Sequence, residues 1–350
     1  MHPGEPLPTT GARHGLPQVV VALFLTALPG CRLTSLPLWG PVEPPSADVY
    51  PVEKVRDLVY YDGPDRDPFR HCLDLYLPRG KKNYPVVVLV HGGAWMLGDN
   101  RCCGLYSTVG EFLASRGVAA VLPNYRLSPG VKHPEHVKDL ARAVAWTRAH
   151  IADYGGSPAK LFLAGHSAGG HLVSLLATDE TYLQAEGVRT ADIRGVIALS
   201  GVYRIPDGNM QFTFGGDTPL AFRLNEVAPV RGDNGPSWAS LAGWPGVPMS
   251  LNVFGPAFGD DPLVRQRASP LCHVRPGLPP FLIFSAGQEL PTLAQMAEEF
   301  YQALLSQGCE ARLVRVPDRN HNTIIFRAIE ADDPVARAML DFIRRHSPKP

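Results

Sequence analysis

The sequence predicts an α/β protein in which a mainly parallel sheet is covered by helices on both faces. Short runs of Val, Ile, Leu and Phe alternate with amphipathic stretches of helical period along most of the chain. The apolar runs are continuous, which indicates strands buried on both faces of the sheet. With 350 residues, 45% of them hydrophobic and 19% charged, the chain can bury the core of one large domain.

The expected elements follow one another in α/β order from about residue 55. Continuous or alternating apolar residues predict strands at 73–78, 84–93, 118–126, 159–167, 193–202, 279–287 and 311–317. Helical periodicity predicts helices at 109–117, 134–155, 168–178, 292–308 and 334–347. Residues 205–273 are rich in Gly, Pro and aromatic residues and show no sustained period. We interpret them as a cap-like insertion before the strand expected at 279–287, and a decoration without a role in function is the alternative.

The first 54 residues differ in composition from the rest. Arg13 and His14 precede an apolar run that ends at Gly30 and Cys31, as in an export signal spanning residues 1–31. This leader resembles a bacterial lipoprotein signal, in which Cys31 would be lipidated and would anchor the chain to a membrane. An ordinary cleaved signal and an unstructured leader remain open. Residues 32–54 are Pro-rich and predict a tether. We therefore expect an exported domain at 55–347, in the periplasm or cell envelope.

Charge and cysteine usage exclude several classes of partner. Lys plus Arg number 33 and so do Asp plus Glu, so we expect no nucleic-acid partner and a small-molecule substrate. The six cysteines show no metal-type spacing, and nothing suggests a metal or an organic cofactor. We favour buried or free thiols, although a bridge involving Cys102 or Cys103 stays open.

Residues 165–169, with the sequence GHSAG, lie between an expected strand and an expected helix. This G-x-S-x-G pattern is typical of a sharp strand-to-helix turn that exposes a nucleophilic serine above a sheet. Ser167 is the candidate nucleophile. Gly165 and Gly169 keep the turn narrow, and Ala168 offers a backbone amide to the reacting group. A glycine-rich turn without catalytic function is the alternative.

Residues 91–95, with the sequence HGGAW, directly follow the apolar run 84–90. Acyl transfer places negative charge on a carbonyl oxygen, and backbone amides aimed at that oxygen stabilise it. Together with Ala168, we expect Gly93 and Ala94 to donate these amides. Gly92 lets the backbone approach the substrate, and His91 is expected to make structural hydrogen bonds.

A serine nucleophile needs a base and an acid, which follow it along the chain in this architecture. His321 lies in the loop 317–324 before the last helix and is the candidate base. Three other histidines follow the serine. His171 lies in the helix expected at 168–178, His273 lies before a Pro-rich turn and His346 lies in the C-terminal tail.

Glu289 is the first carboxylate after the strand 279–287 and is the preferred acid. Asp318 is an alternative, although it also suits a turn that bonds its own backbone. Asp260 and Asp261 lie in the insertion and are further alternatives.

The HGGAW loop, residues 123–172 and the stretch "FGDDPLVRQRASPLCHV" together resemble the α/β-hydrolase superfamily. The similarity is closest to the group containing acetylxylan and feruloyl esterase-like proteins, kynurenine formamidases and isoprenylcysteine methylesterases. It extends from residue 55 to 345 and implies the α/β-hydrolase fold, Ser167 as nucleophile, His321 as base and an HGGAW oxyanion hole. Glu289 stands where aspartate is commoner, and residues 208–250 are an insertion relative to the usual pattern.

We therefore expect a serine hydrolase that cleaves short-chain, acetyl or aryl carboxylic esters through an acyl-enzyme. An arylformamidase or other amidase on the same residues is the nearest alternative, and a catalytically silent lipoprotein binding module is a further one. Aromatic side chains that can wall an acyl or aryl pocket, or simply pack beneath the insertion, are Trp95, Phe212, Phe214, Trp238 and Trp244. The sequence leaves the oligomeric state open.

Overall fold

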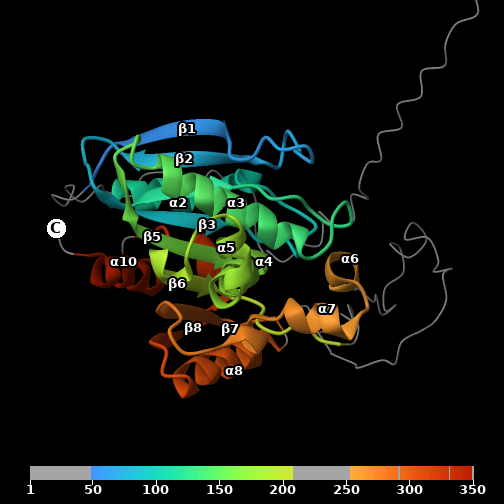
Figure 1. The fold of residues 1–350 in the computed structure, drawn as a ribbon. Coiled ribbons are helices and arrows are strands. Elements are labelled where there is room, and N and C mark those ends of the chain that lie inside the picture. The colour runs from blue at the N-terminus through green and yellow to red at the C-terminus, as the bar shows by residue number, and fades with distance from the viewer. Residues whose placement is uncertain (1–48, 208–252, 291, 331, 349–350) are drawn as a thin grey trace, which may run out of the picture.

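Eight strands form one sheet in the order β1-β2-β4-β3-β5-β6-β7-β8 (Figure 1). The computed structural model describes residues 49–207, 253–290, 292–330 and 332–348. The strands are β1 (Val52–Val59), β2 (Cys72–Pro78), β3 (Tyr84–Val90), β4 (Ala119–Pro123), β5 (Gly156–His166), β6 (Ile193–Leu199), β7 (Phe281–Gln288) and β8 (Ala311–Asn320). β2 pairs antiparallel with β1 and β4, and all other neighbours are parallel. The predicted mainly parallel sheet is confirmed.

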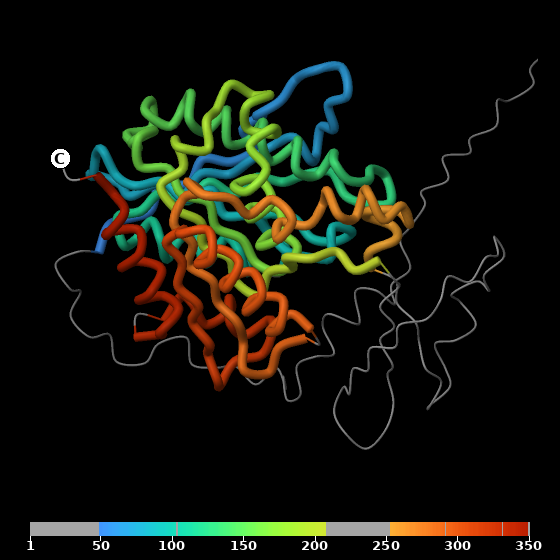
Figure 2. The backbone as a smooth tube through the Cα atoms, turned by 60° about the horizontal axis from the view of Figure 1, so that its bottom comes forward, coloured from blue at the N-terminus to red at the C-terminus, as the bar shows by residue number. Residues whose placement is uncertain are grey.

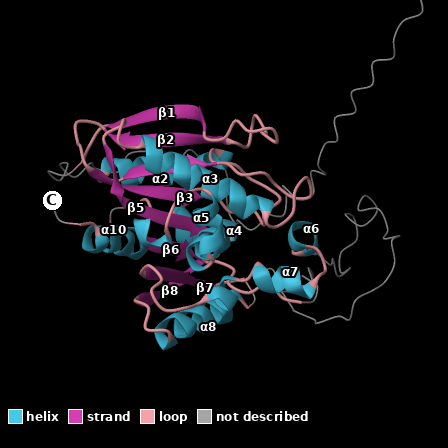
Figure 3. Cartoon of the chain, in the orientation of Figure 1, coloured by secondary structure: helices cyan, strands magenta, loops and turns pink. Residues whose placement is uncertain are grey.

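Helices cover both faces of this sheet (Figure 3). Those longer than two turns are α2 (Leu105–Ser115), α3 (Glu135–His150), α4 (Ala168–Thr178), α8 (Leu293–Ser306) and α10 (Pro334–His346). The shorter ones are α5 (Glu180–Ala185), α6 (Gly255–Phe258), α7 (Pro262–Arg267) and α9 (Thr323–Phe326), with 3₁₀ turns η1 (Cys102–Gly104), η2 (Thr190–Asp192) and η4 (Pro270–His273).

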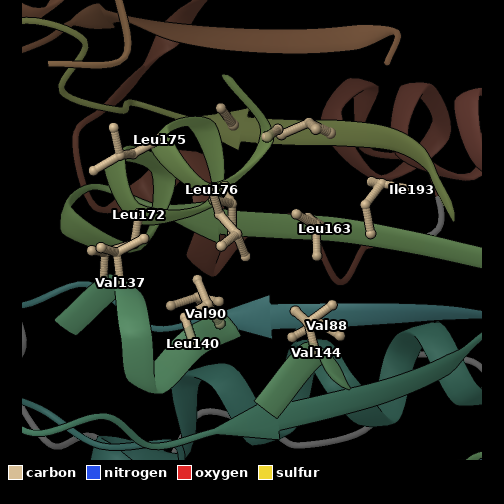
Figure 4. Packing of buried hydrophobic residues seen from close by; sticks show 14 of the residues in the cluster. Val88, Val90, Val137, Leu140, Val144, Leu163, Leu172, Leu175, Leu176 and Ile193 are labelled. Atoms are coloured by element: carbon tan, nitrogen blue, oxygen red, sulfur yellow. The ribbon is translucent and has the colours of Figure 1, made fainter. Parts of the chain in front are cut away.

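The core divides into two layers because successive strand residues point to opposite faces. Val86, Val88 and Val90 of β3 belong to the cluster with residues of α3, α4 and α8, whereas Val87 and Leu89 belong to the cluster with residues of α2, α9 and α10. Figure 4 shows side chains of α3 and α4 packing together over β3 and β5. Full burial of each such aliphatic side chain contributes about 1.5–3 kcal/mol to the stability of the fold, so packing on both faces stabilises the contact between sheet and helices.

The first strand and four short helices are absent from the elements expected from the sequence. β1 begins at Val52, inside the expected tether 32–54, and it is an edge strand whose residues are exposed or half-buried. Its sequence VEKVRDLV contains no continuous apolar run, because charged residues are tolerated on an exposed edge strand. α5, α6, α7 and α9 are each too short to show a helical period in the sequence.

Several expectations concern residues outside those that the structure describes. They are the leader 1–31 with Cys31, most of the tether, and residues 208–252 of the insertion. The two ends of the insertion are described. Residues 253–273 contain α6, α7 and η4, so this part is helical and not irregular as expected. It runs beside the segment that leads into α3 (Figure 2), where the amide of His133 donates to the carbonyl oxygen of Ala257 at 2.7 Å.

Candidate active site

The residues expected to act together follow strands that end at the same edge of the sheet. Ser167 follows β5, Glu289 follows β7 and His321 follows β8. Gln288 pairs with Asn320 across β7 and β8, so Glu289 and His321 are the next residues of two neighbouring strands. The expected loop 317–324 is therefore shorter than the sequence indicated, because β8 continues to Asn320.

Three side chains form a continuous hydrogen-bonded series at this edge. Ser167 Oγ lies 2.9 Å from His321 Nε2, and His321 Nδ1 lies 2.6 Å from Glu289 Oε1. His321 is buried, with 6% of its surface exposed. The carboxylate accepts from Nδ1–H, which leaves Nε2 with a lone pair facing the serine hydroxyl. This is the arrangement in which an imidazole can take the serine proton.

Glu289 is held as a carboxylate by four donors. Oε1 accepts from His321 and from the amide of Leu290 at 3.0 Å. Oε2 accepts from the Ser200 hydroxyl and from the amide of Ala286 at 3.2 Å. Burial raises the pKa of Glu289, but the hydrogen bond and charge of His321, followed by the Ser200 bond, outweigh burial and lower it to about 2.

Ser200 was not among the residues singled out in the sequence. It follows β6 just as Ser167 follows β5, and its φ of 47° is in the left-handed region. A polar residue directly after a buried parallel strand is the signal that would have identified it.

The elbow around Ser167 is tight for a steric reason. Ser167 has a φ of 56° and a ψ of −119°, and α4 begins at the next residue. A Cβ at Gly165 would lie 2.3 Å from the carbonyl oxygen of Gly169, and one at Gly169 would lie 2.2 Å from that of Val90. Both obstacles are backbone, so only glycine fits, and the strained turn lifts the serine out of the core.

The HGGAW loop has three successive residues in left-handed conformations. The φ values of Gly93, Ala94 and Trp95 are 117°, 51° and 59°. The carbonyl oxygen of Gly93 accepts from the amides of Met96 and Leu97 at 3.0 and 2.9 Å, which closes the turn. Within the described residues, the amides of Gly93 and Ala94 donate to no protein acceptor. The loop therefore offers two amides next to the elbow.

Two histidines of these motifs are buried and hydrogen-bonded. His91 Nδ1 lies 2.8 Å from the carbonyl oxygen of Gly92, and its ring stacks on Tyr125. His171 accepts from Trp95 Nε1 at 3.2 Å and lies 2.7 Å from the carbonyl oxygen of Ala268. Burial lowers the pKa of His91 to about 4 and that of His171 to about 3, so both rings are neutral near pH 7.

Trp95 is the one expected pocket aromatic that the structure describes; Phe212, Phe214, Trp238 and Trp244 lie outside the described residues. Its side chain is 2% exposed, and it contacts Phe254, Phe258 and His171. Trp95 thus packs the HGGAW loop against α4 and against the described C-terminal end of the insertion.

The alternative acids have other partners or face solvent. Asp318 is exposed, Asp260 pairs with Arg265 at 3.0 Å, and the Asp261 carboxylate accepts from the amide of Leu263 at the start of α7. The remaining histidines also lie elsewhere: His273 Nε2 is 2.8 Å from the carbonyl oxygen of Arg267, and His346 lies beside Glu310.

The described residues contain neither a candidate metal site nor a candidate membrane span. No group of three or more His, Cys, Asp or Glu side chains there could hold a metal ion. No helix in the same ranges is long and apolar enough to cross a bilayer. Cys72, Cys272 and Cys309 form no disulfide, and the side chain of Cys103 is outside the description.

Comparisons with known proteins find esterases among the similar sequences. The family model BD-FAE matches residues 73–212. An isoprenylcysteine alpha-carbonyl methylesterase of Arabidopsis thaliana is 27% identical over 278 residues, which are 78% of this chain and 57% of that protein. The esterase LipQ of Mycobacterium tuberculosis is 26% identical over 310 residues, 82% of this chain and 65% of that protein. The chain thus spans between half and two thirds of these two relatives.

Solved structures share the fold at low sequence identity. A truncated carbohydrate esterase from gut microbiota has a TM-score of 0.62 and 20% identity, and the match covers 88% of this chain and all of that one (100%). An esterase of Pyrobaculum calidifontis has a TM-score of 0.59 and 21% identity, covering 86% of this chain and 87% of that one. The fold predicted from the sequence is confirmed.

Proposed function

We propose, from the premise that the chain has the α/β-hydrolase fold and resembles esterases of that fold, that it is a serine hydrolase of carboxylic esters. The observation that carries the proposal is the series Ser167–His321–Glu289, with contacts of 2.9 and 2.6 Å. The two ring nitrogens of His321 face the serine hydroxyl and the carboxylate, which is the orientation that a general base between a nucleophile and an acid needs. The esterase relatives and the BD-FAE match support the same chemistry.

The reaction follows from the positions of the protons. Ser167 Oγ attacks the ester carbonyl carbon while His321 Nε2 takes the hydroxyl proton. The carbonyl oxygen becomes negative and accepts from the amides of Gly93, Ala94 and Ala168, of which the last lies at the positive N-terminal end of α4. His321 then returns the proton to the leaving alcohol.

The acyl-enzyme is released by the same groups in reverse. Water enters, His321 takes one of its protons, and the hydroxide attacks the acyl carbon bound to Ser167. Collapse of the second tetrahedral intermediate frees the carboxylic acid and returns the proton to Ser167. Throughout, Glu289 stays ionised and stabilises the imidazolium form of His321, in keeping with its low pKa.

Turnover of paired substrates tests the proposal. Short-chain nitrophenyl esters and an N-formyl aryl amine would be assayed with the parent protein and with Ser167→Ala. We expect ester hydrolysis that Ser167→Ala abolishes. Faster turnover of the formyl amide would show an amidase on the same residues, and inertness toward both substrates would show a silent binding module.

We also propose, on the sequence of residues 1–31 alone, that the chain is exported and anchored through a lipid on Cys31. Membrane fractionation of the full chain and of Cys31→Ser tests this. Loss of the membrane-bound fraction in the variant is the expected result, and equal fractionation of the two would contradict the anchor.

A further inference from the structure

The ring of His166, the residue between Gly165 and Ser167, makes two hydrogen bonds that lead in opposite directions. Nε2 lies 2.7 Å from the carbonyl oxygen of His321. Nδ1 lies 3.1 Å from the hydroxyl of Tyr106, and that hydroxyl accepts from the amide of Gly92 at 2.7 Å. One side chain of the elbow thus joins the backbone of the base to the backbone of the HGGAW loop.

The chemistry of the end groups fixes the direction of every bond in this series. A carbonyl oxygen only accepts, so Nε2 of His166 carries the hydrogen and Nδ1 has the lone pair. The Tyr106 hydroxyl therefore donates to Nδ1 and accepts from the Gly92 amide. Burial, and after it the charge of His321, lowers the pKa of His166 to about 3, so the ring stays neutral and the series is satisfied near pH 7.

Gly92 packs so closely against the elbow that no side chain fits between them. A Cβ there would lie 2.9 Å from the carbonyl oxygen of His166, 3.1 Å from Ser167 Cβ and 3.1 Å from the Tyr106 hydroxyl. The absence of a side chain permits this close approach, and the hydrogen bond from the Gly92 amide to Tyr106 opposes withdrawal. The next two residues are Gly93 and Ala94, whose amides are aimed at the substrate in the proposed reaction.

We propose that His166 and Tyr106 are positioning residues that hold the oxyanion amides and the base in register around Ser167. The inference rests on the proposed function, because it concerns the same reaction. Its physical basis is that misplacing reacting groups by about 1 Å can cost about 10²-fold in rate. His166 touches neither substrate nor the transferred proton in this scheme, and it acts through the backbones of Gly92 and His321.

Two substitutions of His166 separate the two arms of the series. His166→Gln can still reach the His321 carbonyl with its amide NH₂ but leaves the Tyr106 hydroxyl without its acceptor. His166→Asn can still accept from Tyr106 but leaves the His321 carbonyl without a donor. Tyr106→Phe removes only the hydroxyl and keeps the ring, so it breaks both bonds of the arm that His166→Gln cuts once, the one to His166 Nδ1 and the one from the Gly92 amide.

A buried histidine outside the site provides the matched control. His71 accepts at Nδ1 from the amide of Asp67 at 2.9 Å and places Nε2 3.0 Å from Asp139 Oδ1, so it has the same tautomer as His166. It is 1% exposed, against 4% for His166. His71→Gln therefore reports what the loss of a buried histidine does to stability alone.

The experiment measures kcat, KM and melting temperature for the parent and these variants on one nitrophenyl ester. We expect Tyr106→Phe and His166→Gln each to lower kcat by up to about 10²-fold with KM little changed, as for an interaction made in the transition state. The double variant should lose no more than Tyr106→Phe alone, since both substitutions act on one arm. His71→Gln should lower the melting temperature and leave kcat unchanged.

A spectroscopic measurement separates this inference from the proposed function. The downfield NMR signal of the His321 Nδ1 proton reports its bond to Glu289 in the folded chain whether or not an ester is turned over. We expect it in the parent and in Tyr106→Phe, and weakened by faster exchange in His166→Asn. The inference would be overturned if the His166 and Tyr106 variants kept the parent kcat and this signal and only had a lower melting temperature, the result expected for His71→Gln. A parent that hydrolyses no ester yet shows the signal changes would overturn the proposed function alone.

Discussion

Replacing Glu289 by glutamine changes one atom of the proposed triad and keeps its shape. All four hydrogen bonds to the carboxylate come from donors, two on each oxygen: His321 and the Leu290 amide on Oε1, and Ser200 and the Ala286 amide on Oε2. A glutamine has one accepting and one donating end. In either orientation its NH₂ group meets a backbone N–H, which cannot turn away.

The two orientations have different costs, and both impair the reaction. With the NH₂ group toward His321, Nδ1 must accept, so Nε2 carries the hydrogen and cannot take the proton of Ser167. With the oxygen toward His321 the tautomer is correct, but the imidazolium loses its counter-charge and the Ala286 amide loses its acceptor. Removal of the charge and tautomer control at this position costs about 10⁴-fold in kcat. One unsatisfied buried amide costs about 1–3 kcal/mol of folding free energy.

The assay is steady-state hydrolysis of a nitrophenyl ester, with urea unfolding of the same preparations. Asp318→Asn is the matched control, since it makes the same carboxylate-to-amide change at an exposed acid three residues before His321. We expect the kcat loss in Glu289→Gln and parent activity in Asp318→Asn. Near-parent kcat in Glu289→Gln together with a large loss in Asp318→Asn would show that the acid has been assigned to the wrong carboxylate.

Three further predictions concern the groups around the triad. Gly169→Ala should prevent correct folding, because its Cβ would lie 2.2 Å from the carbonyl oxygen of Val90. The control is Gly130→Ala, whose Cβ would have no neighbour nearer than 3.3 Å. It should give soluble protein with a normal circular dichroism spectrum. Ser200→Ala removes one hydrogen bond to a charged carboxylate, an interaction energy of about 1.5 kcal/mol. Steady-state assays should therefore show about a tenfold lower kcat. The pKa of Glu289 is about 2 in the folded chain against 4.5 when unfolded. This difference contributes about 3 kcal/mol to the free energy of unfolding above pH 4.5, and the contribution is lost as the pH falls toward 2. Urea unfolding at a series of pH values should show this part of the acid sensitivity disappearing in Glu289→Gln; an identical pH dependence in both proteins would contradict it.

The centre of the parallel sheet could be predicted because its strands contain continuous apolar runs. β3 and β6 are buried along nearly their whole length, and burial on both faces leaves a direct signal in the sequence. β1 gave no such signal, since an edge strand with one sheet neighbour can be built from alternating charged and apolar residues. The ends of strands are set by tertiary pairing, which explains why β8 reaches Asn320 and not the expected 317.

Residues in local motifs could be singled out from the sequence, whereas residues that act through distant contacts could not. Ser167 and the HGGAW loop stand in short patterns whose spacing follows from the chemistry of a tight turn. Ser200 contacts Glu289 only because the sheet places β6 beside β7. Tyr106 of α2 contacts the site only through the hydrogen bond that its hydroxyl accepts from Gly92. The two partners of His166 lie 60 and 155 residues away along the chain.

Covalent labelling of Ser167 tests the central claim most directly. The purified protein would be treated with a fluorophosphonate, and the modified residue identified by peptide mass spectrometry in the parent, in Ser167→Ala and in His321→Gln. An activated serine predicts one label per chain, on Ser167, absent from Ser167→Ala and greatly slowed in His321→Gln. A parent protein that takes no label, or takes it on another residue, would contradict the account.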